Sequence, residues 1–247
     1  MPNALAQLLL PAECLLCHSL LSFAHSDALV CPVCRHRWRA VRPPWCERCG
    51  QPAPHFGPCR LCPDWPAALT TARSAVWLDD SARAAVHALK YGGLPRIADD
   101  LAAVMARTLA APPRDAVLVP IPLGAGRLRT RGYNQSERLA SALAARWGTR
   151  VAPELLRRAR ETATQTALTP TARLANVAGA FEMRNGEGGV RNADRSAIRS
   201  PHSAFVLIDD VFTTGATLAE AARALERGGA RRITALTFGR AIIPDFT

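Results

Sequence analysis

Lysine is almost absent from this chain of 247 residues, since Lys90 is the only lysine among 31 basic side chains. Arginine therefore carries nearly all of the formal net charge of +11. Guanidinium groups bind phosphate oxygens at two points, so this balance suits phosphate or nucleic-acid ligands. Enrichment in arginine, alanine and proline can equally reflect the base composition of a genome, and charge alone does not separate the two explanations.

Long apolar runs are missing as well. No stretch approaches the roughly 18 to 20 apolar residues that span a bilayer, and residues 1–10 lack the basic start of a secretory signal. We therefore expect a cytoplasmic protein without membrane insertion. Hydrophobic residues make up 49% of the chain, so a sizeable core and a smaller additional module can both form.

Cysteine is confined to the first part of the chain, where it occurs only in CxxC pairs. In the absence of an export signal, this spacing favours metal binding over disulfides. Each pair can place two thiolates on one tetrahedral zinc, so the four pairs supply the ligands of two structural zinc ions. Consecutive pairs close the shorter loops and are favoured, whereas an interleaved arrangement stays open. The predicted ligands are Cys14, Cys17, Cys31, Cys34, Cys46, Cys49, Cys59 and Cys62.

The cysteine-rich segment, residues 1–66, has many prolines and little periodicity, so we expect a zinc-ribbon module that metal rather than a core holds together. Its basic residues alternate with two tryptophans, Trp38 and Trp45. The arginines are Arg35, Arg37, Arg39, Arg42, Arg48 and Arg60. Such a surface is typical of nucleic-acid binding through phosphate contacts and aromatic stacking, although a solvated basic face has the same composition.

A second domain is predicted over residues 71–247, where apolar runs alternate with segments of helical periodicity. Strands are expected at 71–78, 117–121, 233–238 and in the run that starts at Phe205, and helices at 81–90, 97–111, 135–147 and 215–228. Ser81 is the expected cap of the first helix. This alternation predicts an α/β fold, with a parallel sheet flanked by helices. Residues 183–203 read as a flexible insertion.

The clearest functional signal is the strand at Phe205 together with the turn that follows it. Asp209 and Asp210 stand at its carboxyl end, ahead of the hydroxyl-rich turn Thr213-Thr214-Gly215-Ala216-Thr217. Hydroxyls, a glycine and the free N–H groups of a new helix form an anion site. The carboxylates would repel a phosphate, so we expect them to accept hydrogen bonds from sugar hydroxyls or help to hold magnesium. The alternative is an ordinary turn with Thr213 as N-cap.

Two further segments suit the rest of a phosphorylated sugar. The turn after the strand at 117–121 holds Leu123 and Gly124, followed by Arg127, Arg129 and Arg131. These arginines predict a pyrophosphate loop, unless the loop is merely basic and exposed. Residues 157–171 are polar and lack periodicity, so Arg158 and Gln165 belong either to a lid that covers the substrate or to an ordinary connection.

These motifs resemble known families. The acidic pair and threonine turn are similar to the phosphoribosyl pyrophosphate (PRPP) signature of type I phosphoribosyltransferases. The whole chain resembles the ComF family of competence-associated proteins, with Gly124 standing where that family often has histidine. The segments that carry this resemblance are the cysteine pairs, Lys90-Tyr91-Gly92, Val119-Pro120-Ile121-Pro122-Leu123, Arg127-Leu128-Arg129, Arg131-Gly132-Tyr133-Asn134-Gln135, and Arg158, Thr162, Gln165, Arg173 and Asn176 ahead of Gly179-Ala180-Phe181.

The resemblance implies a type I phosphoribosyltransferase fold, PRPP with Mg²⁺ as ligand, Asp209 and Asp210 as catalytic residues, and a role in DNA uptake. It leaves three functions open. One is transfer to an unknown acceptor. Another is a sensor that binds PRPP without catalysis and contacts single-stranded DNA or a competence helicase. The third is nucleobase salvage.

Overall fold

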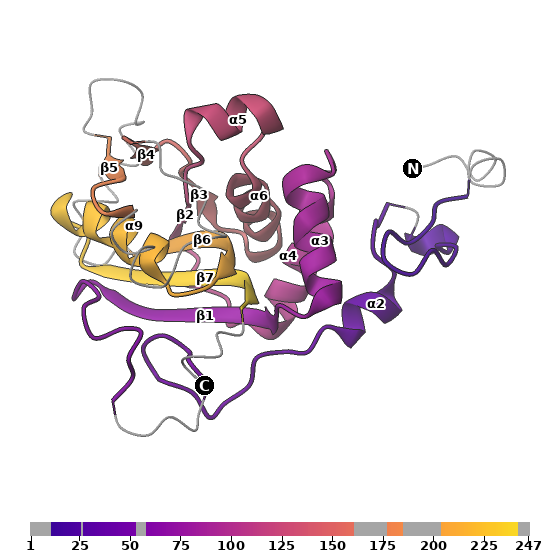
Figure 1. Ribbon diagram of the computed structural model, residues 1–247, viewed down its shortest axis with the longest axis horizontal. Helices are drawn as coiled ribbons and strands as arrows, with labels where there is room; N and C mark the ends of the chain where they lie inside the picture. The colour runs from indigo at the N-terminus through magenta and orange to yellow at the C-terminus, as the bar shows by residue number, and fades with distance from the viewer. Residues whose placement is uncertain (1–10, 26, 53–57, 161–176, 185–203, 242–247) are drawn as a thin grey trace.

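The computed structural model describes residues 11–25, 27–52, 58–160, 177–184 and 204–241 (Figure 1). Its helices and strands are, in chain order, η1 (Phe23–His25), α2 (Pro32–Arg37), β1 (Leu69–Trp77), α3 (Asp80–Tyr91), α4 (Ile97–Thr108), β2 (Val117–Pro120), α5 (Ala125–Arg131), α6 (Gln135–Trp147), β3 (Arg150–Val151), β4 (Leu156–Arg158), β5 (Phe181–Met183), β6 (Ala204–Phe212), α9 (Ala216–Arg227) and β7 (Arg232–Arg240). Within these ranges no helix is both long and apolar enough to cross a membrane.

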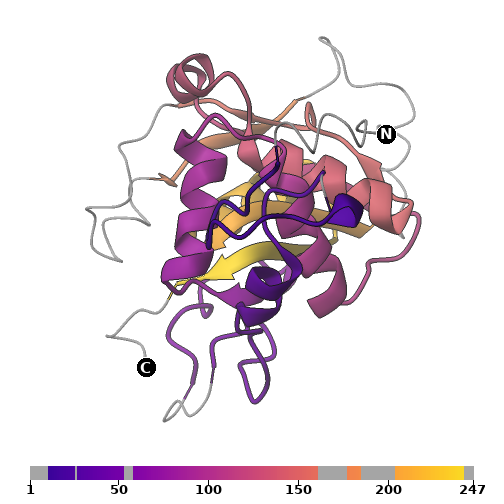
Figure 2. The same cartoon turned by 90° about the vertical axis from the view of Figure 1, so that its right-hand side faces the viewer.

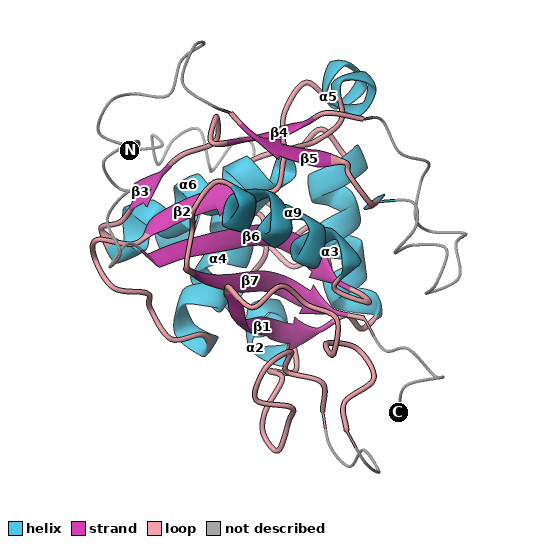
Figure 3. Cartoon of the chain, turned by 90° about the vertical axis from the view of Figure 1, so that its left-hand side faces the viewer, coloured by secondary structure: helices cyan, strands magenta, loops and turns pink. Residues whose placement is uncertain are grey.

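Five parallel strands form the central sheet in the order β1-β7-β6-β2-β3, and β4 and β5 pair separately as antiparallel strands. Strand β2 and the first five residues of β6 are buried because both faces of the sheet are covered there. Along β6, Val206 and Ile208 face the core with α3, α4 and α6, whereas Phe205 and Leu207 face α9. Figure 3 shows α9 on the near face of the sheet. The predicted α/β fold is confirmed.

The predicted helices and strands are present with shifted ends, and one cap is wrong. The side chain of Asp79, not Ser81, caps α3 by accepting a hydrogen bond from the Ala82 N–H at 2.9 Å. The Ser81 hydroxyl instead accepts a hydrogen bond from the indole N–H of Trp38 at 3.0 Å. The second helix, α4, ends at Thr108 rather than at 111. Of the predicted insertion at 183–203, residues 185–203 lie outside the described part of the chain.

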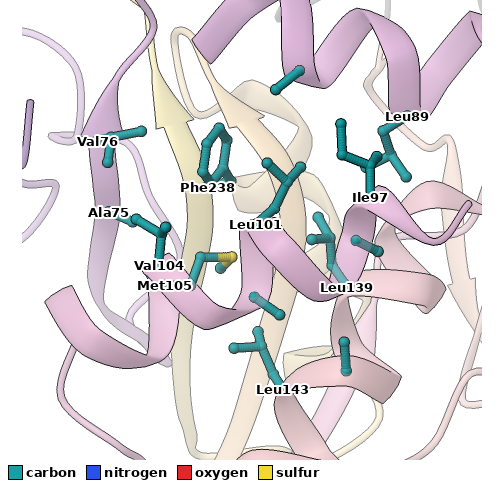
Figure 4. Packing of buried hydrophobic residues seen from close by; sticks show 14 of the residues in the cluster. Ala75, Val76, Leu89, Ile97, Leu101, Val104, Met105, Leu139, Leu143 and Phe238 are labelled. Carbon is teal, nitrogen blue, oxygen red and sulfur yellow. The ribbon is translucent and has the colours of Figure 1, made fainter. Parts of the chain in front are cut away.

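Helix α4 is held against the sheet by one apolar stripe. Ile97, Leu101, Val104 and Met105 recur at helical spacing and are buried. Figure 4 shows these side chains directed toward Phe238 of β7 and its neighbours. Beside the stripe, the buried side chain of Asp100 accepts hydrogen bonds from the Leu29 and Val30 N–H groups, so α4 also contacts the amino-terminal segment.

The cysteine-rich segment contacts both faces of the sheet at its β1 edge. Figure 2 shows the molecule from the side on which the first half of this segment lies. Cys14, Cys31 and Cys34 are buried in the core that contains α3 and α4. Cys49 and Cys62 are buried in the other core, with α9. The residues in between run along β1, where the Trp77 N–H donates to the Arg39 carbonyl at 2.8 Å and the Val41 N–H donates to the Ala75 carbonyl at 3.1 Å. The edge strand is therefore covered.

Candidate functional site

Two clusters of four cysteines form in the amino-terminal segment. In each, all sulfur atoms lie within 4.8 Å of one another: Cys14, Cys17, Cys31 and Cys34 in the first, and Cys46, Cys49, Cys59 and Cys62 in the second. Separations of 3.8 Å, 3.7 Å and 3.4 Å occur between sulfur atoms of different pairs. Zinc bonded to four thiolates at about 2.3 Å separates the sulfurs by about 3.8 Å. The clusters therefore fit two structural zinc ions, and the prediction of consecutive pairing is confirmed.

The acidic pair lies at the carboxyl end of β6, beside the last turn of α3 and the first turn of α6. Lys90 of α3 forms an ion pair with the Oδ2 atom of Asp210, whose side chain is 4% exposed. The Oδ1 atom of Asp209 accepts hydrogen bonds from the Ser136 hydroxyl and from the Asp210 N–H, both at 2.9 Å. Three elements thus converge on two neighbouring carboxyl groups, and Figure 1 shows α3 standing beside the end of the sheet.

The two carboxyl groups differ in their electrostatics. Burial, reinforced by the negative charge of Asp210, raises the pKa of Asp209 to about 7. Burial alone would also raise the pKa of Asp210, but the ammonium group of Lys90 holds that pKa below its ordinary value. Burial opposes the charge of Lys90, yet the attraction of Asp210 raises the pKa of Lys90. At neutral pH, Asp210 and Lys90 are therefore charged, and Asp209 is close to its titration midpoint.

The turn between β6 and α9 has a backbone that only glycine accommodates well. Gly215 is the N-cap of α9 with φ +79°, and a Cβ atom there would lie 2.6 Å from the indole of Trp65. Gly215, rather than the expected Thr213, is thus the N-cap of α9. The Thr214 hydroxyl accepts a hydrogen bond from the Ala216 N–H at 3.4 Å, and Thr217 lies half-buried in the first turn of α9. The N-cap residue Gly215 itself offers no side chain to this helix end.

Residues of the second cysteine cluster and its neighbours pack against the same turn. The rings of Trp65 and Phe212 have centroids 6.1 Å apart. The guanidinium group of Arg240, at the end of β7, lies 4.0 Å from the centroid of Phe212. The same group donates to the Cys49 carbonyl at 2.7 Å and to the Gln51 side-chain oxygen at 2.6 Å. The turn therefore rests on the zinc-ribbon segment, a role for Trp65 and Arg240 that sequence reasoning missed.

The predicted pyrophosphate loop is largely helical, which corrects the expectation of a loop. Leu123 and Gly124 precede α5, and Gly124 is its N-cap. Arg127 and Arg131 lie one turn apart on the same face of α5, whereas Arg129 is exposed on the opposite face. Arg131 donates to the Gln135 side-chain oxygen, and its guanidinium lies 5.2 Å from the ring centroid of Tyr91. Arg131 thus reaches the residue that follows Lys90.

The predicted lid is only partly described. Arg158 lies in strand β4, paired with Phe181 of β5, and its guanidinium is 5.1 Å from the centroid of that ring. Arg158 is thus placed in a strand rather than a loop. Gln165 lies outside the described residues.

The structure also sorts the basic and aromatic residues of the zinc-ribbon segment. Arg35 forms an ion pair with Asp100 of α4 at 3.0 Å, and Arg48 donates to the carbonyls of Cys62 and Trp65 and to others nearby. Trp38 is 4% exposed, so its ring does not offer a face to a base. The remaining arginines, Arg37, Arg39, Arg42 and Arg60, are exposed.

Sequence reasoning missed two partners of the acidic pair. A signal for Lys90 was present, because a single lysine among 30 arginines marks a position where a flexible ammonium group is required. No sequence signal indicated Ser136, which lies 73 residues before Asp209.

The fold and the cysteine clusters define an α/β protein with an amino-terminal double zinc ribbon, and residues 5–64 match the family model of a double zinc ribbon domain. DNA utilization protein YhgH of Salmonella typhi is 33% identical over 235 residues, covering 92% of this chain and 96% of that protein. Its namesake in Escherichia coli K12 is 32% identical with the same coverage. Competence protein ComFC of Bacillus subtilis is 29% identical, covering 92% and 94%. The chain belongs to this ComF family, in which the relatives are named for DNA utilization and competence.

Proposed function

We propose that this protein binds PRPP with Mg²⁺ at the carboxyl end of β6 and acts in DNA uptake during natural transformation. The observation that carries the proposal is the convergence of Asp209, Asp210 and the glycine-containing turn at the start of α9. The relatives named for DNA utilization and competence support the biological role. This role implies a cytoplasmic protein and allows a competence helicase as a partner.

Each part of PRPP has a counterpart in the proposed site. The hydroxyls of Thr213, Thr214 and Thr217 and the N–H groups around Gly215 and Ala216 bind the 5′-phosphate. Asp209 accepts hydrogen bonds from the ribose hydroxyls, while Lys90 keeps Asp210 ionised beside it. Arg127 and Arg131, on one face of α5, bind the pyrophosphate.

Magnesium fits the same donor set, because carboxylate and phosphate oxygens are its preferred ligands. When bound, it neutralises charge on the pyrophosphate. In a transfer reaction the bond from the ribose carbon to pyrophosphate breaks and a bond to the acceptor forms. Asp209 and Asp210 then stabilise the positive charge that develops on the ribose. In a sensor, the same groups bind PRPP without transfer.

Isothermal titration of PRPP into the zinc-loaded protein with Mg²⁺ tests the binding site. Asp209→Asn with Asp210→Asn should abolish the binding heat, because the ribose contacts and the local charge are lost. Asp115→Asn is the matched control, since Asp115 is exposed in the loop before β2. Binding by the double variant that equals the wild type would reject the site.

A screen for pyrophosphate release separates an enzyme from a sensor. Nucleobases and small amines are offered with PRPP, and release above background with any of them identifies a transferase. Release with a free purine or pyrimidine supports salvage. Tight PRPP binding with no release across the screen supports the sensor.

A further inference from the structure

A basic cleft lies apart from the proposed PRPP site, between the last turn of α4 and the end of α2 with the segment that follows it. Its volume is about 470 Å³. Its lining consists of His36, Arg37, Trp38, Arg39, Ala40, Arg42, Arg107 and Thr108. We call it the arginine cleft. None of these residues belongs to the turn at 213–217, to the acidic pair or to α5.

All charged side chains that line the arginine cleft are basic. Four arginines and a histidine line it, and no carboxylate does. None of the four arginines forms an ion pair with a described residue. Arg35, two residues before Arg37, is by contrast paired with Asp100. Like charges gathered without partners repel one another, and an anion that bridges them relieves this repulsion.

Both walls of the cleft are fixed before any ligand arrives. One wall follows the backbone from Arg39 to Val41, which hydrogen-bonds to β1. The other wall is the end of α4, which Leu101 and Met105 anchor in the core. The Arg107 side chain also donates to the Arg35 carbonyl at 3.4 Å, which joins α4 to α2 directly before the first wall. Little ordering of the backbone is therefore required for binding.

We infer that the arginine cleft binds the phosphate backbone of single-stranded nucleic acid, an assignment that rests on the proposed role in DNA uptake. Guanidinium groups bind successive phosphates at two points each. A concave cleft suits a flexible strand that can enter it, whereas a duplex presents a convex surface and meets only the rim. Trp38 contributes to the lining, but its ring is buried and its N–H is donated to Ser81, so base stacking adds little. Binding is therefore tolerant of sequence and strongly dependent on salt.

Fluorescence anisotropy with labelled oligothymidine tests the cleft in the full-length, zinc-loaded protein. The cleft variant carries Arg37→Gln, Arg39→Gln and Arg42→Gln, all at exposed positions. The control variant carries Arg138→Gln, Arg231→Gln and Arg232→Gln, which are exposed elsewhere and remove the same charge. Zinc content and circular dichroism establish that both variants fold.

The cleft variant should bind oligothymidine at least about tenfold more weakly than the wild type. Between about 50 and 200 mM salt, its log–log slope should be shallower by about 2, since each lost phosphate contact on a single strand contributes about 0.7. The control should stay within about threefold of the wild type. An equal loss in both variants would reduce the effect to net charge and overturn the inference, as would wild-type binding by the cleft variant.

Two further arms complete the experiment. Duplex DNA, or vesicles that contain phosphatidylserine, should compete with the labelled strand less well than unlabelled oligothymidine. Stronger competition by either would overturn the assignment to single strands. Titration of the cleft variant with PRPP keeps the two sites separate. If the cleft variant binds PRPP as the wild type does but no longer binds DNA, the result supports the cleft. PRPP binding by the variant Asp209→Asn with Asp210→Asn tests only the proposed function and says nothing of the cleft.

Discussion

The guanidinium group of Arg240 lies 4.0 Å from the centre of the Phe212 ring and donates hydrogen bonds to Cys49 and Gln51. Phe212 is the last residue of β6, directly before the threonine turn, whereas Cys49 belongs to the second cysteine cluster. Arg240 is 1% exposed, so this contact is part of the core. The zinc ribbon and the proposed phosphate site are therefore physically joined.

Gly215→Ala should destabilise the protein more than an equivalent change at another left-handed glycine. The new methyl group would lie 2.6 Å from Trp65, in addition to the backbone strain at φ +79°. Gly132→Ala is the control, because Gly132 has the same φ of +79° and nothing within 4 Å of the added Cβ. Strain alone costs about 1–2 kcal/mol. Urea unfolding should show a clearly larger loss at Gly215, and equal losses would mean that Trp65 does not confine the turn.

Lys90→Met should lower the free energy of unfolding by about 3 kcal/mol, because it leaves the carboxylate of Asp210 buried without a partner. Adding Asp210→Asn should restore most of the loss. Arg96→Ala is the control, since Arg96 and Asp27 form an exposed ion pair at 3.7 Å that contributes at most about 1 kcal/mol. Denaturant titration of the four proteins measures these differences. A loss at Lys90 no greater than that at Arg96 would contradict the buried pair.

PRPP affinity should rise with pH through the titration of Asp209. Its pKa is raised to about 7, so the carboxyl group is protonated below that pH and accepts hydrogen bonds from ribose hydroxyls poorly. Ionisation above pH 7 restores the acceptor. The phosphates of PRPP titrate too, so the dissociation constants of the wild type are compared with those of Asp209→Asn across the same pH range. A ratio between the two proteins that does not change with pH would exclude this role of Asp209.

Removing either cysteine cluster should cost one zinc ion, because each cluster supplies a complete ligand set. Cys14→Ser with Cys17→Ser and Cys46→Ser with Cys49→Ser are matched variants for metal analysis. Only the second should weaken PRPP binding strongly, since only that cluster contacts Arg240. Circular dichroism ensures that folded proteins are compared, and equal effects on PRPP would deny the special position of the second cluster.

Local signals explain which features the sequence predicts correctly. Three features can be recognised from a short stretch of sequence: the apolar run at Phe205, the CxxC pairs and the helical stripe of α4. The cap of α3 was misplaced because Asp79 and Ser81 are both good capping residues two positions apart, and only the start of the helix decides between them. Helix α5 was missed because it contains no buried residue and therefore has no apolar stripe.

Long-range contacts explain the rest. Trp65 meets Gly215, and Arg240 meets Cys49 across 191 positions. Such pairs depend on how the amino-terminal segment wraps the β1 edge, which no single-sequence pattern encodes. The basic surface was predicted as one feature. The structure divides it into arginines bonded within the protein, such as Arg48, and those of the arginine cleft.

The most direct test of the central claim is a crystal structure with Mg²⁺ and PRPP bound. The account predicts the 5′-phosphate within hydrogen-bonding distance of the turn from Thr213 to Thr217, with the ribose hydroxyls against Asp209. PRPP bound elsewhere, with this turn and Asp209 making no contact to it, would contradict the account.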